Sequence, residues 1–241
     1  MKYALVTGGT KGIGKAISFA LLEKGYFVII NYSNDDENAN LTIKEFDSQY
    51  LDRTSLIKED LSDQKNIKGF CHKIKNLTSQ LDVMILNAGK TDRSPFGEID
   101  YQIWLSVFET NLFAPFFIIQ ELHNIMPQGS SILITGSVMG IYPHSLSVSY
   151  GVSKAAVHTM VKNLVKFLAP MNIRINAIAP GFVETEWQKN KPVELKKSIT
   201  NKIALNRFGT PEEIANSAMF IISNNYINGE ILKVDGGYSY M

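Results

Sequence analysis

The sequence predicts an α/β fold built on an open sheet of parallel strands, with helices packed on both faces. Two observations predict it. Short apolar runs alternate with longer stretches of helical periodicity along all 241 residues, and a glycine-rich turn joins the first apolar run to the first helical stretch. Because no low-complexity segment or linker interrupts this alternation, residues 1–241 are expected to form a single domain.

The overall composition indicates a protein that binds neither nucleic acid nor a membrane. Hydrophobic residues make up 45% of the chain, enough for a sizeable core, and the formal net charge is only +1 with no basic tract. The apolar patch at 112–119 contains Pro115 and is too short to span a bilayer, and the first apolar run is too short for a signal peptide. The single cysteine, Cys71, suits a reducing compartment. We expect a cytoplasmic protein, and no metal site is predicted.

The first apolar run, at 3–7, leads into a glycine turn and then into a helical pattern that continues through Lys24. The turn reads Gly8-Gly9-Thr10-Lys11-Gly12-Ile13-Gly14. Glycines let the backbone approach a ligand closely, and a helix N-terminus offers free N–H groups and the positive end of a dipole. This segment is therefore predicted to cradle the pyrophosphate of a dinucleotide.

The end of the second expected strand, at 27–32, bears on the choice of cofactor. In a βαβ dinucleotide unit, an acidic residue about 20 positions beyond the glycines usually holds the ribose hydroxyls of NAD. Here that place carries only uncharged residues, Asn31, Tyr32 and Ser33. A 2′-phosphate is therefore not repelled, and Lys11 could supply the matching charge. NADP is favoured, while Asp35 and Asp36 keep NAD open.

The alternation continues through a helix at 36–50, a strand at 55–58, a helix at 64–78 and a strand at 82–86. Asp60 and Leu61 follow the third strand, where Asp60 could meet the adenine; equally, Asp60, Ser62 or Asp63 could cap the next helix. The fourth strand ends in small residues at the place where a ribose would lie, Asn87-Ala88-Gly89.

A long helical pattern from about 98 to 125 contains Asn111 among apolar residues. A buried polar side chain needs a hydrogen-bond partner, so Asn111 could hold a water. The fifth strand, at 131–135, delivers Ser137 to its C-terminal end, which is where ligands bind in open parallel sheets.

Tyr150 and Lys154 follow in a helix-compatible run, four positions apart and therefore on one helix face. A free tyrosine has a pKa of about 10. One positive charge about 5 Å away would lower that pKa by about 2 units and make the phenol a usable proton donor and acceptor. Ser137, Tyr150 and Lys154 are expected to converge on one crevice.

The sixth strand, at 174–179, ends in Pro180 and Gly181. Between 182 and 207 the strand–helix rhythm is lost, and the segment carries Trp187 and five lysines. It is predicted to be a lid over the site or, alternatively, a solvated amphipathic surface. A helix at 211–223 and a strand at 230–234 complete the domain.

Together and in this order, these motifs resemble the short-chain dehydrogenase/reductase family over essentially the whole chain. The residues that carry the resemblance are Thr7 with the glycine turn, Asn87-Ala88-Gly89, Asn111, Ser137, Tyr150, Lys154, Pro180-Gly181 with Thr185, and Val234-Asp235-Gly236-Gly237. The resemblance implies one doubly wound (Rossmann) domain with a seven-stranded parallel sheet, and usually a homotetramer.

The resemblance also implies a role for each matching residue. Tyr150 would exchange a proton with the substrate oxygen as hydride moves between substrate and nicotinamide, and Ser137 would hydrogen-bond that oxygen. Lys154 would lower the tyrosine pKa and bind the nicotinamide ribose, and Asn111 would hold a water that relays protons. The cofactor would be bound by Gly8, Thr10, Lys11, Gly12, Ile13, Gly14, Tyr32, Ser33, Asp60, Leu61, Asn87, Ala88, Gly89, Tyr150, Lys154, Pro180, Gly181, Val183 and Thr185.

Within the family the chain is most similar to the 3-oxoacyl-acyl-carrier-protein reductases. Two departures are Leu86, where those enzymes usually have asparagine, and the segment 126–131, which lacks their basic residues. An NADP-dependent reductase of a carrier-bound or coenzyme A 3-oxoacyl thioester is therefore expected, and the lysine-rich segment favours an anionic substrate. A dehydrogenase for a sugar, steroid or small alcohol stays open. A non-catalytic NADP(H)-binding redox sensor is the alternative from another class, although a sensor would not need all four catalytic side chains.

Overall fold

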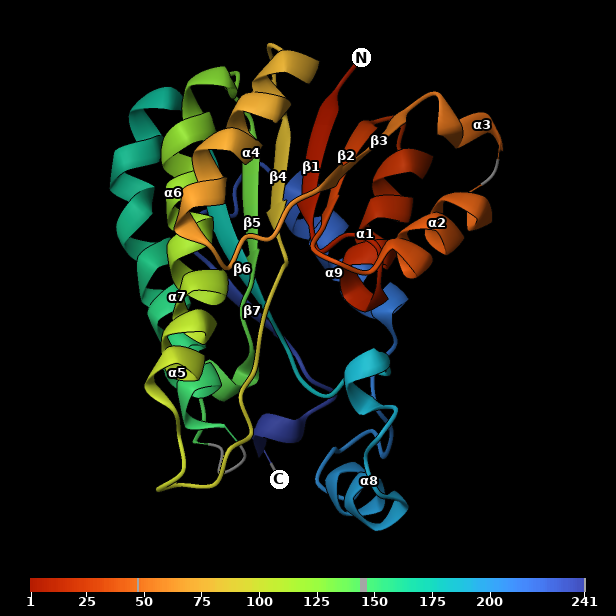
Figure 1. Ribbon diagram of the computed structural model, residues 1–241, viewed down its shortest axis with the longest axis vertical. Coiled ribbons are helices and arrows are strands. Elements are labelled where there is room, and N and C mark those ends of the chain that lie inside the picture. The colour runs from red at the N-terminus through yellow and green to blue at the C-terminus, as the bar shows by residue number, and fades with distance from the viewer. Residues whose placement is uncertain (47, 144–146, 241) are drawn as a thin grey trace.

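The computed structural model describes residues 1–46, 48–143 and 147–240. Within them a seven-stranded parallel sheet has the order β3-β2-β1-β4-β5-β6-β7 (Figure 1). The strands are β1 (Tyr3–Thr7), β2 (Phe27–Tyr32), β3 (Thr54–Lys58), β4 (Val83–Leu86), β5 (Ser131–Thr135), β6 (Arg174–Pro180) and β7 (Ile231–Val234). The chain winds outward from β1 in one direction and from β4 in the other, so the sheet is doubly wound and opens a crevice where the order reverses.

Helices cover both faces of this sheet. They are α1 (Gly12–Glu23), α2 (Asp36–Glu45), α3 (Ser48–Leu51), α4 (Gln64–Leu77), α5 (Tyr101–Phe108), α6 (Ala114–Leu122), α7 (Val148–Leu168), α8 (Val193–Thr200) and α9 (Pro211–Ser223). Figure 1 shows α4 to α7 on one side of the sheet and α1, α2 and α9 on the other, with α8 projecting beyond the strand ends. This arrangement places the segment around α8 beside the crevice.

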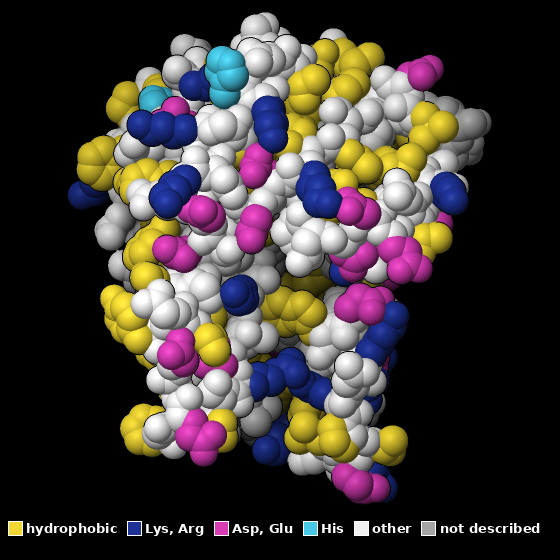
Figure 2. All heavy atoms as spheres, in the orientation of Figure 1, with side chains coloured by type: hydrophobic (Ala, Val, Ile, Leu, Met, Phe, Trp, Pro, Cys, Tyr) yellow, Lys and Arg dark blue, Asp and Glu magenta, His cyan; other side chains and the backbone are white. Residues whose placement is uncertain are grey.

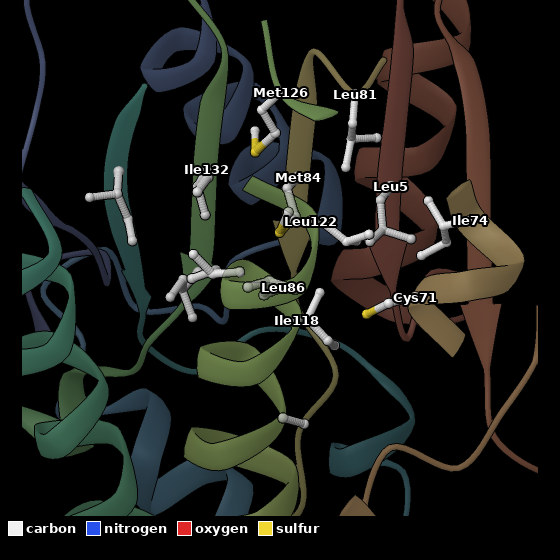
Figure 3. Close-up of a cluster of buried hydrophobic side chains, with 14 of the residues drawn as sticks. Leu5, Cys71, Ile74, Leu81, Met84, Leu86, Ile118, Leu122, Met126 and Ile132 are labelled. Atoms are coloured by element: carbon white, nitrogen blue, oxygen red, sulfur yellow. The ribbon is translucent and has the colours of Figure 1, made fainter. Parts of the chain in front are cut away.

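The core lies in two apolar layers separated by the sheet. Strand β5 contributes to both, because Ile132 and Ile134 join the layer under α4, α6 and α7, whereas Leu133 joins the layer under α1 and α9. Figure 3 shows part of the first layer, in which side chains from the strands meet Ile118 and Leu122 of α6. Strands buried on both faces read as continuous apolar runs, which is why the sequence places them well.

The expected helix at 36–50 is wrong as one element. The structure ends α2 at Glu45 and begins the short α3 at Ser48, with residue 47 outside the described part. Between them Phe46 is buried and its ring lies 6.3 Å from that of Phe19 on α1. Apolar packing at this position overrides the continuous helical propensity of the segment.

The helix expected from 98 to 125 begins at Tyr101, where the side chain of Asp100 caps it by accepting from two backbone N–H groups. It is interrupted by a π-helical turn at Glu109–Phe113 before α6 continues it. By length and composition the stretch Tyr101–Ile125, with a mean hydropathy of 1.3 in its most apolar window, could also cross a membrane. Core helices of globular proteins share these properties, and α6 here packs against the sheet.

Candidate active site

A cleft of about 580 Å³ opens at the carboxyl ends of the strands, and Figure 2 shows the molecule hollowed between its body and the lower projection. Most of the predicted site residues line it, namely Gly8, Thr10, Lys11, Gly12, Ile13, Tyr32, Ser33, Asp60, Leu61, Asn87, Ala88, Gly89, Ser137, Tyr150, Lys154, Pro180, Gly181, Val183 and Thr185. Gly14 and Asn111 are outside the lining. Within the described ranges, no three His, Cys, Asp or Glu side chains gather as metal ligands would.

The glycine turn between β1 and α1 is shaped by close backbone contacts. Gly8 and Gly12 have positive φ angles of +60° and +47°, which favour glycine. Gly14 contributes indirectly, because a Cβ there would lie 2.2 Å from the Gly8 carbonyl oxygen. The Asn87 amide donates to the carbonyls of Thr7 and Gly8 at 3.2 Å each and so ties the end of β4 to this turn. These contacts within the turn and with Asn87 fix the backbone of the turn at the wall of the cleft.

In the structure Lys11 pairs with Asp35, which the sequence analysis named only as an acidic residue close to the end of the second strand. The Lys11 ammonium forms an ion pair with Asp35, and the Asp35 side chain also accepts from the Asn38 N–H at 3.0 Å to cap α2. The Lys11 contact and these caps lower the pKa of Asp35 to about 2. Lys11 lines the cleft, so its predicted contact with a 2′-phosphate stays a prediction, and that phosphate would have to compete with Asp35 for the ammonium.

A second ion pair lies at the end of β2. The Tyr32 hydroxyl donates to Asp36 at 3.0 Å, and the Lys58 ammonium contacts the same carboxylate at 2.5 Å. The contact with Lys58 is the main cause that holds the Asp36 pKa below its usual range. At the adenosine end the cleft lining contains Lys11 with Asp35, Glu59 and Asp60, and the pair Lys58–Asp36 lies just outside it. These charges are compatible with NAD as well as NADP.

Asp60 lines the cleft and does not cap the following helix. Its Oδ1 accepts from the N–H and hydroxyl of Ser62 at 2.9 and 2.8 Å, which closes a local turn. The cap of α4 is Asp63, whose side chain accepts from the Lys65 N–H. Leu61 is buried beside Asp60 and still reaches the cleft wall.

Ser137 and Tyr150 come together from two elements. Ser137 follows β5 and is buried, and its Oγ accepts from the Met139 N–H at 3.1 Å. Tyr150 stands in the first turn of α7, which Ser147 caps. Both side chains line the cleft, and the neighbouring Ser137 hydroxyl acts to lower the pKa of the Tyr150 phenol.

The expected effect of Lys154 on the tyrosine is wrong for this structure. Burial raises the pKa of Tyr150 to about 12, and the hydrogen bond with Ser137 opposes it only in part. Burial also lowers the pKa of Lys154 to about 8. The Lys154 ammonium lies 5.6 Å from the tyrosine ring centroid and donates to the Thr135 carbonyl at 2.6 Å. Desolvation determines the pKa of Tyr150 because the Lys154 ammonium is directed at the Thr135 carbonyl and not at the phenol.

Asn111 lies in the π-helical turn, and its side chain makes three hydrogen bonds within the protein. Its Nδ2 donates to the Lys90 carbonyl and to the Ser153 hydroxyl, each at 2.9 Å, and its Oδ1 accepts from the Lys90 N–H at 2.8 Å. The side chain therefore fixes the chain just beyond Gly89. The predicted role in holding a water stays a prediction, and the second lone pair of Oδ1 and the backbone of Asn111 could serve it.

His158 is a site residue that the sequence analysis missed. It is buried one helical turn beyond Lys154, and its Nε2 accepts from the Ser137 N–H at 3.4 Å. A Cβ on Gly136 would lie 2.2 Å from this nitrogen. Burial and the neighbouring charges of Lys154 and Lys162 lower the His158 pKa to about 4, so the ring is a neutral acceptor. Its spacing of four from Lys154 is the signal that could have found it.

The segment at 182–207 reaches back over the cleft. Trp187, within a 3₁₀ turn at Glu186–Gln188, meets the Tyr150 ring edge-on with 6.0 Å between centroids. Thr185 faces the glycine turn, where a Cβ on Gly12 would lie 3.0 Å from its methyl group. One short segment therefore bridges the two ends of the cleft.

Comparisons with known proteins extend over nearly the whole chain. Residues 8–239 match the family described as "Enoyl-(Acyl carrier protein) reductase". A 3-oxoacyl-[acyl-carrier-protein] reductase of Aquifex aeolicus is 35% identical over 98% of this chain and 96% of its own. The enzyme of the same name from Staphylococcus aureus is 32% identical over 98% of this chain and 97% of its own.

Solved structures are also similar over nearly the whole chain. BdcA in complex with NADPH is similar with a TM-score of 0.88 and 27% identity, covering 98% of this chain and 93% of that one. RhlG of Pseudomonas aeruginosa in complex with NADP has a TM-score of 0.89 and 29% identity, covering 98% and 96%.

Fold, cleft and relatives together define the class, an NAD(P)-dependent oxidoreductase that acts on CH–OH and C=O groups. The match to the family covers nearly all of the chain, and the relatives align end to end. The chain belongs to the short-chain dehydrogenase/reductase family.

Proposed function

We propose that this protein is an NADP-dependent carbonyl reductase whose substrate is a 3-oxoacyl thioester. The observation that carries the proposal is that Ser137, Tyr150 and the buried Lys154 line one cleft at the carboxyl ends of the strands. The printed names of the relatives from Aquifex aeolicus and Staphylococcus aureus support the thioester.

The chain's own residues fit a dinucleotide. Gly8 and Gly12 line the cleft with left-handed backbone and no side chain, so a pyrophosphate can approach the turn closely. Asn87, Ala88 and Gly89 would face a ribose, and Pro180, Gly181, Val183 and Thr185 the nicotinamide end. When bound, the nicotinamide supplies hydride.

The proton chemistry follows from the positions of three side chains. Ser137 would hydrogen-bond the substrate oxygen where negative charge develops, and Tyr150 would donate its phenolic proton to that oxygen. The raised pKa of Tyr150 keeps the phenol protonated before reduction. Lys154 holds the end of β5 through Thr135 and would meet the nicotinamide ribose. Trp187 shields the phenol from water on its open side.

NADP is proposed over NAD because two structural neighbours hold NADP or NADPH in their solved complexes. Lys11 lies at the adenosine end beside Asp35, a carboxylate that a 2′-phosphate would have to displace, and Lys58 lies near the end of β2 with Asp36, outside the cleft lining. NAD stays the second candidate, because Asp35, paired with Lys11, and Asp36, paired with Tyr32, leave acidic groups near the place where ribose hydroxyls would bind.

We propose that residues 1–241 work as one catalytic unit with 182–207 as its lid. This segment has a small apolar core of its own, in which Ile199 and Ile203 pack with Phe182 and Phe208. Met139 and Tyr238 of the body pack against that core. A segment held by so few buried contacts can move as a unit over the cleft.

We also propose a homotetramer, in the cytoplasm. Two apolar faces are exposed. One, on α6, α7 and the π-helical turn before α6, includes Phe113, Phe116 and Val152. The other, on α9, includes Phe220, which is 55% exposed, and the edge strand β7 is half-exposed. Two separate self-complementary faces are what a closed assembly of four copies needs. Light scattering tests this, and a monomer mass at micromolar concentration would count against it.

The test of function is oxidation of NADPH with acetoacetyl-coenzyme A, with NADH and Tyr150→Phe run beside it. We expect rapid loss of NADPH, and a drop of roughly 10²-fold or more in Tyr150→Phe because the proton donor is removed. NADPH binding should survive this change. Tight NADPH binding without thioester turnover would move the substrate to a sugar, steroid or small alcohol, and no turnover on any carbonyl would favour the redox sensor.

A further inference from the structure

The inner side of the lid carries a buried amide without a partner. Gln188 lines the cleft and is only 9% exposed. Its Oε1 is enclosed and accepts no hydrogen bond from any residue that the structure describes. Its Nε2 likewise makes no hydrogen bond within residues 1–46, 48–143 and 147–240. An amide that has lost water without gaining a partner destabilises the protein until a ligand completes its hydrogen bonds.

The backbone around Gln188 holds the amide in this place. The Gln188 N–H donates to the Thr185 carbonyl at 2.9 Å, and the Gln188 carbonyl accepts from the Lys191 N–H at 3.2 Å. The residue thus closes the 3₁₀ turn at Glu186–Gln188. Because both backbone groups are bonded, the side chain is fixed at its base, whereas the terminal torsion of a glutamine is soft. A rotation of the amide group alone can therefore turn either of its polar atoms toward a ligand in the cleft.

The neighbours of Gln188 lie between the proton donor and the cofactor turn. Trp187 meets the Tyr150 ring with 6.0 Å between centroids. Thr185, which is bonded to Gln188 through the backbone, faces Gly12, where a Cβ would lie 3.0 Å from the threonine methyl group. Both neighbours also line the cleft. In a dinucleotide that extends from the glycine turn to the phenol, the part between these two places is the nicotinamide.

The chemistry of the unpartnered amide selects its ligand. Oε1 needs an N–H or O–H donor, and Nε2 needs an acceptor such as a carbonyl oxygen. A pyrophosphate offers acceptors alone and would leave Oε1 unsatisfied. A primary carboxamide presents an N–H and a C=O side by side and can bond to both atoms of Gln188 at once. A secondary amide in an extended arm can bond to one of them.

We propose that Gln188 hydrogen-bonds an amide group of a ligand in the cleft, with Oε1 accepting the ligand N–H, and so closes the lid on that ligand. The nicotinamide carboxamide is the source of the amide that the two-atom match and the neighbours of Gln188 favour. The other source is an amide in the arm of a pantetheine thioester, and this version alone rests on the proposed function. In both versions the residue beside Trp187 couples ligand binding to the position of the lid.

The first comparison is between the oxidised cofactor and its 3-acetylpyridine analogue, in which a methyl group replaces the carboxamide NH₂. Calorimetry on the whole enzyme measures both affinities without turnover, with NADP⁺ or, if the enzyme prefers it, NAD⁺. Gln188→Met should weaken binding of the carboxamide cofactor roughly tenfold and leave the affinity for the analogue unchanged. Gln128→Met, the same change at an exposed glutamine outside the cleft lining, should alter neither affinity.

The second comparison uses the acetoacetyl thioesters of N-acetylcysteamine, which carries one amide, and of butanethiol, which carries none. A higher KM of Gln188→Met for the amide-containing ester alone, with both cofactor affinities unchanged, would support the proposal and assign the amide to the substrate arm. If no thioester is reduced, the proposed function fails on its own. Calorimetry then still decides between a contact with the carboxamide and no contact.

A purely structural role of the amide is tested in the cofactor-free protein. Methionine is similar in size to glutamine and has no carbonyl to leave unsatisfied, so the urea midpoint of Gln188→Met should equal or exceed that of the wild type. A lower midpoint would show that the amide serves the fold. That result, equal losses of affinity for ligands with and without an amide, or no loss for any ligand would overturn the proposal.

Discussion

The Lys154 ammonium donates a 2.6 Å hydrogen bond to the backbone carbonyl of Thr135, and this contact ties helix α7 to the end of strand β5. Thr135 in turn donates from its hydroxyl to the Asn87 side chain at 3.1 Å, and Asn87 holds the glycine turn. The catalytic helix and the cofactor turn are thus connected by one chain of hydrogen bonds. A change at Lys154 is expected to affect stability as well as chemistry.

The pH dependence of folding reports on Lys154. Its pKa is lowered from 10.5 to about 8 by burial, so the folded protein releases this proton at lower pH than the unfolded chain does. The free energy of unfolding should therefore rise between about pH 8 and about pH 10.5, at about 1.4 kcal/mol per unit at most. Urea unfolding of the wild type and Lys154→Met at about pH 7.5 and about pH 9.5 measures this. The same pH slope in both proteins would show that Lys154 does not titrate with a lowered pKa in the folded protein.

His158 is expected to act through Ser137. Because its neutral Nε2 accepts from the Ser137 N–H, His158→Phe should lower kcat by about tenfold with little change in the KM or in NADPH affinity. His158→Gln, which can present an oxygen acceptor at a similar reach, should restore much of the loss. The measurement is steady-state kinetics with an NADPH titration by fluorescence.

A double-mutant cycle separates this positioning role from a general loss of stability. In the Ser137→Ala background, His158→Phe should cost little further kcat, because the group that it positions is already absent. Additive losses of kcat, or a wild-type kcat in His158→Phe, would show that the histidine only fills space between Gly136 and Gly140.

Removing the charge of Asp35 should favour NADPH. Asp35→Asn frees Lys11 to meet a 2′-phosphate, while asparagine preserves the cap of α2. We expect the ratio of NADPH to NADH affinity to rise several-fold. Glu45→Gln is the matched control, because Glu45, at the end of α2, pairs with Lys15 of α1 and lies outside the cleft lining. Both affinities are measured by fluorescence titration.

The opposite change tests the same electrostatics. Tyr32→Asp adds a carboxylate at the end of β2 and should shift preference toward NAD by repelling the 2′-phosphate. An unchanged ratio of NADP to NAD in both Tyr32→Asp and Asp35→Asn would show that this end of the cleft does not recognise the phosphate.

Two glycines at helical positions should respond in opposite ways to alanine. At Gly14 a Cβ would lie 2.2 Å from the Gly8 carbonyl oxygen and 2.5 Å from the Asn87 amide nitrogen, so Gly14→Ala should destabilise by about 1–3 kcal/mol and weaken NADPH binding. At Gly69, inside α4, a Cβ has nothing within 4 Å. Gly69→Ala should stabilise by about 0.5–1 kcal/mol through helix propensity alone. Denaturant midpoints measure both, and equal shifts would refute the contact at Gly14.

The sequence locates the regular elements well where their physical signals are local. Strand β6 reads as an apolar run ended by a proline and a glycine, and the structure extends it by one residue to Pro180. Helix α9 has the expected bounds, because Thr210 and Glu213 form a capping box around a proline at the first turn. Doubly wound strands in these positions then bring Ser137 and Tyr150 to the same crevice.

The features that the sequence did not reveal depend on contacts between distant segments. The break after α2 results from the burial of Phe46 against α1, and the ion pair of Lys11 with Asp35 requires the turn and α2 to be placed in space. The expected pKa of Tyr150 was wrong because spacing along a helix gives proximity but neither the direction of the Lys154 ammonium nor the extent of burial. Packing determines both.

The π-helical turn at Glu109–Phe113 has a consequence for protein engineering. Such a turn accommodates one more residue than the α-helix it interrupts, so α5 and α6 form one rod whose two halves are out of phase by about 100°. Deleting one residue inside the turn would restore a regular helix and keep the two halves in their present orientation, whereas a deletion in α5 or α6 would rotate one half against the other. Chimeras and loop transplants between relatives should therefore move this turn as an indivisible block, with both junctions placed outside it.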